Sequence, residues 1–200
     1  MAGLVDGEIE LVEQGHLAVG PERDPGDSRP RGGGEEGTAP ASPWRGGLRH
    51  PVPSAREPDS FSADVGQAAY EEIDVAPDDA AGNNYGWSIF EGDHCYSGGC
   101  DATGKVFPVL EVAHGDAGTC SIIGGFVYRG RALPEVAGRY FYGDYCGGWI
   151  RSFRYAAGSA VERVQWLDTS HHLTSFGVDS VGELYVATDE GTLYRIDPVR

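Results

Sequence analysis

From Ala63 onward the chain is a succession of short apolar and aromatic runs separated by Gly, Asp and Asn. The runs are YEEIDVA, FPVLEVA, GGFVYRG, RYFYGDY, GWIRSFRYA, RVQWLD, TSFGVD, ELYVATD and TLYRIDP. None of them extends into a long stretch with the 3.6-residue period of a helix, whereas short runs rich in β-branched and aromatic residues are typical of strands. The pattern therefore predicts an all-β sandwich, barrel or propeller.

The spacing of a repeated pattern favours the propeller. SADVGQAAYEEID, YGDYCGGWIRSF and VATDEGTLYRID each contain a β run, an Asp, a short turn with Gly and then an aromatic residue. Their aspartates, Asp64, Asp144 and Asp189, are separated by 80 and then 45 residues. A propeller blade takes about 40 to 45 residues, so the longer step fits one blade plus the loop NNYGWSIFEGDHCYSGGCDATGK. We predict about three blades of a β-propeller, one of them between Gly124 and Asp168.

The first 62 residues differ in composition from the rest. They hold eight of the twelve prolines but only two of the 21 aromatic residues. Residues 20–60 show no apolar period, so they cannot bury enough surface to offset the entropy of ordering. Residues 5–19 alternate weakly, as a short strand would. We therefore predict a disordered or non-native segment over 1–62 and a propeller part over 63–200.

The segment RYFYGDYCGGWIRSF, residues 139–153, is so dense in aromatic residues that an active site, a metal site and a tight hairpin all need consideration. A hairpin accounts for most of it: the alternating aromatics would face neighbouring sheets and Asp144 would cap the turn. Gly147 and Gly148 would supply the positive φ values of a tight turn.

The cysteines all follow residue 62, and they are Cys95, Cys100, Cys120 and Cys146. A zinc site is the alternative to disulfides, but the C-x4-C spacing, the irregular positions of the other two and the lack of a nearby histidine pair make a poor zinc pattern. We expect two disulfides, Cys95–Cys100 and Cys120–Cys146. Disulfides indicate an oxidising compartment.

Acidic side chains gather before and inside the long loop. They are Glu71, Glu72, Asp74, Asp78, Asp79, Asp93, Asp101 and Asp116. Oxygen ligands on a loop rich in Gly and Asn suit Ca²⁺, although the D-x-D-x-D-G arrangement is absent and a solvated acidic loop is the alternative. His114 lies in an Asp- and Gly-containing turn, and no nucleophile stands beside it in the sequence.

The charge of the chain excludes some partners. The formal net charge is −16, and no basic stripe interrupts it. Nucleic acids and anionic membranes need clustered Lys and Arg, so neither is expected as a partner. No apolar run approaches the roughly 18 residues of a membrane span, and the first 15 residues lack the pattern of a signal peptide.

Several motifs together resemble the soluble quinoprotein glucose/sorbosone dehydrogenase family, which includes the propeller of Hedgehog-interacting protein. They are ADVGQAAYEEIDVAP, GNNYGWSIFEGDHCY, CSIIGGFVYRGRALPEVAGRYFYGDYCGGWIRSFR and SFGVDSVGELYVATDEGTLYRI, which occur in the family's order over about residues 63–198. The resemblance implies a secreted or periplasmic six-bladed propeller and calcium. In the true dehydrogenases it also implies pyrroloquinoline quinone (PQQ), which accepts hydride from a sugar.

The resemblance assigns roles to five positions. Main-chain oxygens of Gly66 and Gln67 match those that approach the calcium on the quinone. Glu72 and Tyr85 match ligands of a structural calcium site. Arg49, in GLRHP, matches a quinone-contacting arginine of the family's GLRNP motif, although His50 stands where that motif has Asn.

The departures from the family concern catalysis. The blades that carry the family's catalytic histidine would lie before residue 47, so no catalytic residue is assigned here. Cys146 falls where the sugar dehydrogenases have a quinone-contacting lysine, and HHLTSF falls where they have an arginine pair. We therefore expect the C-terminal half of a sugar-dehydrogenase-like propeller that is inactive as this chain. The alternative is a secreted, calcium-dependent propeller that binds protein or carbohydrate without catalysis.

Overall fold

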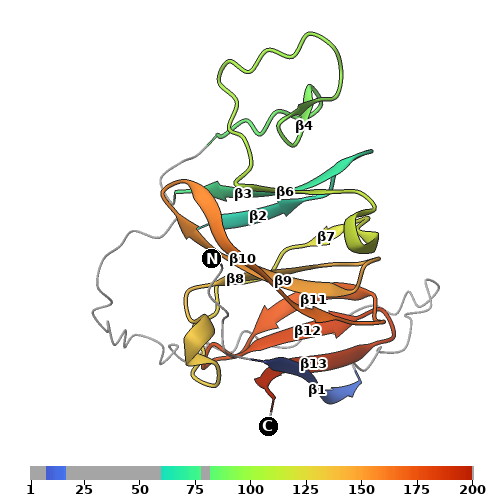
Figure 1. Cartoon of the computed structure of the whole chain (residues 1–200), viewed down its shortest axis with the longest axis vertical. Coiled ribbons are helices and arrows are strands. Elements are labelled where there is room, and N and C mark those ends of the chain that lie inside the picture. Colours follow the sequence, from blue (N-terminus) through green and yellow to red (C-terminus); the bar gives the residue numbers. More distant parts are fainter. Residues whose placement is uncertain (1–7, 17–59, 78–81, 200) are drawn as a thin grey trace, which may run out of the picture. The chain divides into compact units, whose positions relative to one another are not determined.

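The computed structural model describes residues 8–16, 60–77 and 82–199, and the regular secondary structure of these residues is almost entirely β (Figure 1). Two 3-10 turns, η1 (Asp116–Gly118) and η2 (Pro134–Val136), are the helical elements of these ranges. The described part of the chain contains no helix long and apolar enough to cross a membrane. The strands form antiparallel sheets, so the all-β prediction is confirmed.

The central sheet has the strand order β10-β9-β8-β7. Its strands are β7 (Ile122–Ile123), β8 (Tyr140–Asp144), β9 (Trp149–Ala156) and β10 (Ser159–Asp168). A bridge between Val127 and Tyr140 continues the pairing beyond β7. Three of these strands, β8, β9 and β10, coincide with runs that the sequence predicted for one blade between Gly124 and Asp168. The fourth strand differs from the prediction, because β7 lies just before Gly124 and the run GGFVYRG contributes the bridge at Val127 instead.

A second sheet has the order β1-β13-β12-β11. Its strands are β1 (Ile9–His16), β11 (Leu173–Val178), β12 (Leu184–Thr188) and β13 (Thr192–Pro198). The weak alternation in residues 5–19 does form a strand, and this strand pairs with β13 in a register that joins Ile9 to Pro198. The start of the chain thus supplies the outer strand of the last sheet, a pairing that the sequence did not reveal.

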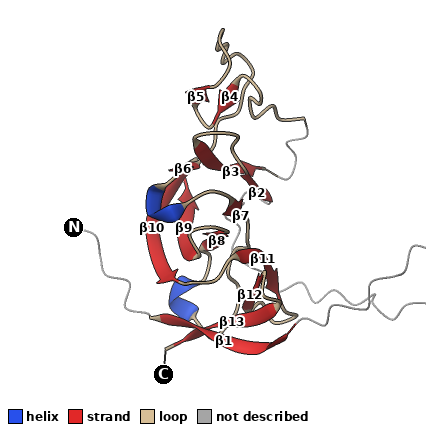
Figure 2. Ribbon diagram, turned by 90° about the vertical axis from the view of Figure 1, so that its right-hand side faces the viewer, coloured by secondary structure: helices blue, strands red, loops and turns tan. Residues whose placement is uncertain are grey.

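The third sheet, β2-β3-β6, has three described strands. They are β2 (Ser60–Asp64), β3 (Tyr70–Ala76) and β6 (Leu110–Ala113). The long loop between β3 and β6 carries a small hairpin of β4 (Phe90–Glu91) and β5 (His94–Cys95). Figure 2 shows this hairpin beside β3 and β6. Residues 17–59 lie outside the described residues, so the predicted disorder of this segment and the boundary at 62/63 stay predictions.

Two apolar clusters hold the sheets together, and β8 contributes to both. Tyr140 and Tyr142 pack with Ile73 of β3, whereas Phe141 packs with Leu184 and other residues of the last sheet. Successive side chains of a strand point to opposite faces, so the aromatic run of β8 fills the space on both sides of its sheet. This confirms the prediction that the alternating aromatics face neighbouring sheets.

The β8–β9 hairpin also shows why the turn contains Asp and Gly. The Asp144 carboxylate accepts hydrogen bonds from the backbone amides of Ser121 (2.9 Å) and Gly147 (2.7 Å). Gly148 has φ +62°, the left-handed region that favours glycine. The prediction for Gly147 was wrong, because its φ is not positive. A side chain there would instead overlap the Trp149 ring.

Both predicted disulfides are present. Cys95 pairs with Cys100 and Cys120 with Cys146, with Cα atoms 5.7 and 5.6 Å apart. The first closes the loop that follows β5, and the second joins the connection before β7 to the β8–β9 turn. No cysteine in the described residues is free, so the zinc alternative for the cysteines is excluded.

Candidate metal centre

One face of the sheet β2-β3-β6 carries a row of carboxylates. Glu72 of β3 is in register with Asp64 of β2 on one side and with Glu111 of β6 on the other. Directly opposed residues of antiparallel strands project on the same face with closely spaced Cβ atoms. Asp74, two residues along β3, projects on that face too. The sheet therefore gathers four acids that lie far apart in the sequence.

The two acids of β3 in this row are buried without full pairing. Glu72 is 7% exposed and Asp74 only 2%. Glu72 Oε2 and Asp74 Oδ1 are buried and have no hydrogen-bond partner in the structure. Burial, reinforced by Asp74 and Asp64, raises the pKa of Glu72 to about 7. Burial and the nearby Asp64 likewise raise the pKa of Asp74 to about 7. Unpaired buried carboxylates are costly, so these two oxygens are candidate ligands for a cation.

The β4–β5 hairpin places two further potential metal ligands, Asp93 and His94, beside Glu111. His94 Nε2 lies 3.2 Å from Asp93 Oδ1 and 3.5 Å from Glu111 Oε2. The ligand atoms of these three residues all lie within 4.8 Å of one another. The His94 ring stacks on Tyr70, with ring centroids 3.8 Å apart. The amide of Asp93 donates a hydrogen bond to Glu111 Oε1, which fixes the hairpin above the sheet.

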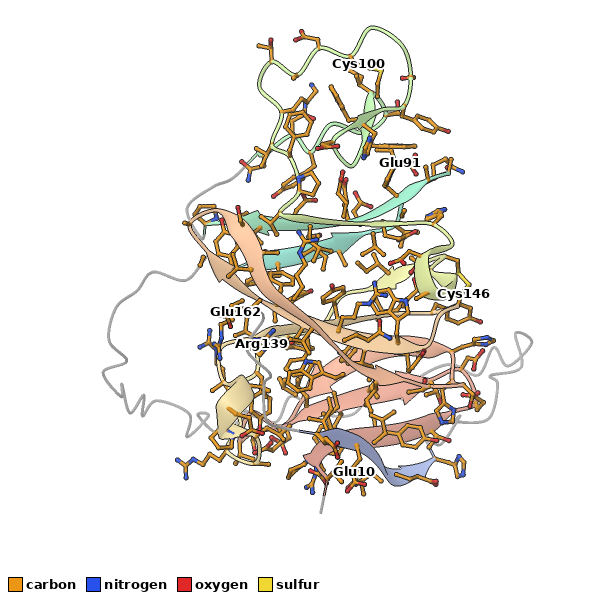
Figure 3. All side chains as sticks on the ribbon, viewed as in Figure 1. Glu10, Glu91, Cys100, Arg139, Cys146 and Glu162 are labelled. Carbon is orange, nitrogen blue, oxygen red and sulfur yellow. A yellow bond between two sulfur atoms is a disulfide. The ribbon has the colours of Figure 1, made fainter. Side chains whose placement is uncertain are left out.

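The loop between β2 and β3, which contains Gly66 and Gln67, is fastened to the same hairpin through Glu91. Glu91 Oε1 accepts hydrogen bonds from the amides of Ala68 (2.6 Å) and Ala69 (2.8 Å). Burial opposes ionisation of Glu91, but these backbone donors outweigh it and lower its pKa. A Cβ at Gly66 would overlap the carbonyl oxygen of Tyr70, so this position requires glycine. Figure 3 shows Glu91 between the hairpin loop and the sheet.

A pocket of about 260 Å³ opens between the loop and the hairpin. Its lining includes Asp64, Val65, Gly66, Gln67, Tyr70, Glu72, Trp87, Phe90, Glu91 and Gly92. Three of the residues that the resemblance singled out, Gly66, Gln67 and Glu72, thus share one pocket. Tyr85 is not among the lining residues, and its hydroxyl accepts a hydrogen bond from Asn83 Nδ2 at 3.2 Å. Arg49 lies outside the described residues.

The opposite face of β3 holds a separate polar pair. The Glu71 side chain is fully buried, and its Oε1 lies 2.5 Å from His114 Nε2. Its Oε2 accepts a hydrogen bond from the amide of Ile122 at 2.8 Å. Glu71 therefore ties β3 to β7, and His114 is oriented by a carboxylate. Both residues were flagged in the sequence, but their contact was not predicted.

Three members of the candidate centre escaped sequence reasoning. Glu111 and Asp64 join Glu72 only through strand register, and His94 joins through the hairpin. Asp93 was expected among the acids of the long loop. The signal that could have found Asp64 and Glu111 is their place on strands flanking YEEID, once the order of the three strands is known.

The donor set can be tested against calcium. Asp64, Glu72, Asp74, Asp93 and Glu111 offer carboxylate oxygens, the ligands that Ca²⁺ prefers. The partnerless Glu72 Oε2 is the atom that a cation would satisfy. The residues therefore offer the ligand type that calcium prefers. The ligand atoms that lie within 4.8 Å of one another are those of Asp93, His94 and Glu111, and the nitrogen of His94 is more typical of zinc or other transition metals.

The sheets of four, four and three strands define a protein of β-propeller type, and comparisons with known proteins agree. No family model matches the sequence. The HIPL1 protein of Arabidopsis thaliana is 30% identical over 194 residues, which cover 78% of this chain and 28% of that protein. The HIPL2 protein of the same plant is 35% identical over 116 residues, or 50% of this chain and 16% of that protein.

A solved structure of a glucose dehydrogenase gives the fold. It superposes with a TM-score of 0.53 at 18% identity, covering 70% of this chain and 41% of that one. The predicted resemblance to the soluble quinoprotein glucose/sorbosone dehydrogenase family is confirmed, and so is the propeller architecture. The chain spans less than half the length of each of these relatives.

Proposed function

We propose that this chain is a calcium-binding, non-catalytic propeller related to the quinoprotein sugar dehydrogenases. The observation that supports this most strongly is the buried, partnerless Glu72 Oε2 in a row with Asp64 and Glu111. A bound Ca²⁺ would satisfy this oxygen and neutralise the mutual repulsion of the acids. Glu72 keeps its proposed role as a ligand, and Tyr85 is retained as a proposed ligand from the adjoining loop.

PQQ is a cofactor of the family's dehydrogenases, and we expect this chain to bind it weakly or not at all. PQQ, where it is bound, accepts hydride from the sugar. Gly66 and Gln67 would contribute main-chain oxygens and Arg49 a guanidinium. The expected cationic contacts are replaced, however: Cys146 is bonded to Cys120, and His172 Nδ1 is held by Asp189 at 2.9 Å. Neither replacement supplies the permanent positive charge of lysine or arginine.

Sugar oxidation needs a base that removes the hydroxyl proton. Among the described residues we assign no such base, since the family's catalytic histidine has no counterpart in residues 63–199. We expect no PQQ-dependent oxidation of glucose or another aldose by the purified chain. A dye-linked assay with added PQQ and Ca²⁺ checks this, and clear turnover above a blank without protein would establish the dehydrogenase function instead.

Calcium binding is measured separately by isothermal titration calorimetry on chelator-treated protein. Wild type should bind Ca²⁺, and Glu72→Gln should bind it at least tenfold more weakly. Glu135→Gln is the matched control, because Glu135 is exposed and lies on η2, outside the row. Equal Ca²⁺ affinities for all three proteins would show that Glu72 is not a ligand of the bound ion.

The disulfides bear on where the protein works. Two disulfides persist most readily in an oxidising environment such as the periplasm or the extracellular space. We therefore retain secretion as part of the proposal. Recovery of the bonded cysteines from an extracellular or periplasmic fraction of the native source would support it, whereas reduced protein confined to the cytosol would contradict it.

A further inference from the structure

Two tryptophans of the described residues lie against arginines that are also paired with acids. The Arg151 guanidinium carbon lies 3.9 Å from the Trp149 ring centroid, and its Nη1 lies 3.4 Å from Asp116 Oδ2. The same arrangement recurs at Trp166. There the Arg139 guanidinium carbon lies 5.8 Å from the ring centroid and Nη1 lies 3.3 Å from Glu162 Oε2. A guanidinium suits such sites because it stacks on an aromatic face while it donates to a carboxylate.

Trp87, the third tryptophan of the described residues, shares a pocket with acidic residues but with no described arginine. It is 57% exposed and lines the pocket of about 260 Å³ together with Asp64, Glu72 and Glu91. No Lys, Arg or His is among the described residues that line this pocket. An aromatic wall beside several carboxylates attracts a cation.

The aromatic wall extends beyond Trp87 and is held in place. Tyr96 is 43% exposed, and its ring centroid lies 5.0 Å from that of Trp87. The Tyr96 amide donates to the Ile89 carbonyl at 2.9 Å, and Ser97 Oγ donates to the Ser88 carbonyl at 2.6 Å. With the Cys95–Cys100 disulfide, these contacts hold the backbone that carries the two rings, which reduces the entropy lost on binding.

A second observation adds a hydrogen-bond acceptor to this pocket. Glu72, 7% exposed, lines it with an Oε2 atom that has no partner. We propose that the pocket binds an arginine side chain presented by a partner protein, with the guanidinium stacked on Trp87 and an N–H donated to Glu72. A quaternary ammonium could stack on the ring but has no N–H to donate, so it would leave Glu72 unpaired.

The inference does not rest on the calcium proposal. Ca²⁺ and a guanidinium would compete for the same Glu72 oxygen, but only the guanidinium uses the aromatic rings. Loss of the Trp87 ring should therefore weaken binding of the peptide and leave binding of Ca²⁺ unchanged. Failure of the arginine site with normal Ca²⁺ binding, or the reverse, separates the two proposals.

The experiment titrates the full chain, in chelator and at low salt, with the blocked tripeptide acetyl-Gly-Arg-Gly-amide, and follows tryptophan fluorescence and NMR shifts. The matched probe is the same peptide with citrulline, which keeps the shape of arginine without its charge. We expect the arginine peptide to bind and the citrulline peptide to bind at least tenfold more weakly.

Variants test whether the arginine peptide binds at this pocket. Trp87→Ala should weaken the arginine peptide about tenfold, and Trp87→Phe should weaken it less, because an aromatic face remains. Phe126→Ala is the control, since Phe126 is 40% exposed and lines a different pocket. Urea unfolding of each variant checks that the fold is kept. No binding of the arginine peptide, equal binding of the citrulline peptide, or an unchanged affinity in Trp87→Ala would overturn the proposal.

Discussion

Replacing Glu72 by Gln should stabilise the metal-free protein at alkaline pH. Burial, with the charges of Asp74 and Asp64, raises the pKa of Glu72 from 4.5 to about 7. A carboxyl whose pKa is higher in the folded state holds its proton more tightly there, so folding is favoured at low pH. This contribution is complete below about pH 4.5 and is lost as the pH rises through about 7.

The size of the effect follows from the shift. Each pKa unit corresponds to about 1.4 kcal/mol, so the ionised Glu72 destabilises the metal-free fold by roughly 3 kcal/mol above pH 7. Gln keeps the shape of the side chain without the charge. Glu72→Gln should therefore match wild type near pH 4.5 and exceed it by up to about 3 kcal/mol at pH 8, provided that a chelator is present.

The assay is urea unfolding in EDTA at pH 4.5, 6, 7 and 8, with Glu135→Gln as the control. Calcium should reverse the order at pH 8, because binding to the folded state stabilises wild type more than the variant. If wild type and Glu72→Gln keep the same difference at every pH, or if wild type gains stability between pH 4.5 and 8 relative to the variant, the reasoning about this row of acids is wrong.

Three further perturbations test the fold. Replacing Cys120 and Cys146 by Ser removes a bond between residues 26 positions apart and should lower the free energy of unfolding by about 3 kcal/mol; an unchanged urea midpoint would contradict this. Ile9→Ala truncates a side chain that is 4% exposed in the core of the last sheet, so it should cost about 2 to 4 kcal/mol if β1 pairs with β13 in solution. A loss below 0.5 kcal/mol in thermal or urea unfolding would show that β1 is not part of the core. Gly148→Ala, at φ +62° and against the Thr169 carbonyl, should lower stability by at least 1 kcal/mol, whereas Gly158→Ala, with open space around it, should cost less; equal losses would refute the steric argument.

The fold was largely predictable because its signals are local. Strand runs, Asp-Gly turns and their spacing can be recognised in short stretches of sequence. The β8–β9 hairpin, for example, is recognisable from residues 139–153 alone. The pairing of β1 with β13 joins Ile9 to Pro198. A weakly alternating segment does not specify its partner across such a distance, because many edges could accept it.

The candidate centre was predictable only in part for the same reason. Glu72 could be singled out by its motif, but Asp64 and Glu111 become its neighbours through the register of three strands. Cross-strand neighbours depend on strand order, which composition and period do not encode. The role of Glu91 as an acceptor for the amides of Ala68 and Ala69 likewise depends on a contact across more than 20 residues.

The position of a bound ion tests the central proposal most directly. Crystals of the full chain grown with Ca²⁺, and a second set in which a lanthanide replaces it, would locate the ion by anomalous scattering. We expect a peak about 2.3 to 2.6 Å from Glu72 Oε2, with further oxygen ligands from the row that includes Asp64 and Glu111. An anomalous map from crystals grown with saturating Ca²⁺ that shows no peak beside Glu72, or shows the ion bound elsewhere, would contradict the proposed calcium centre.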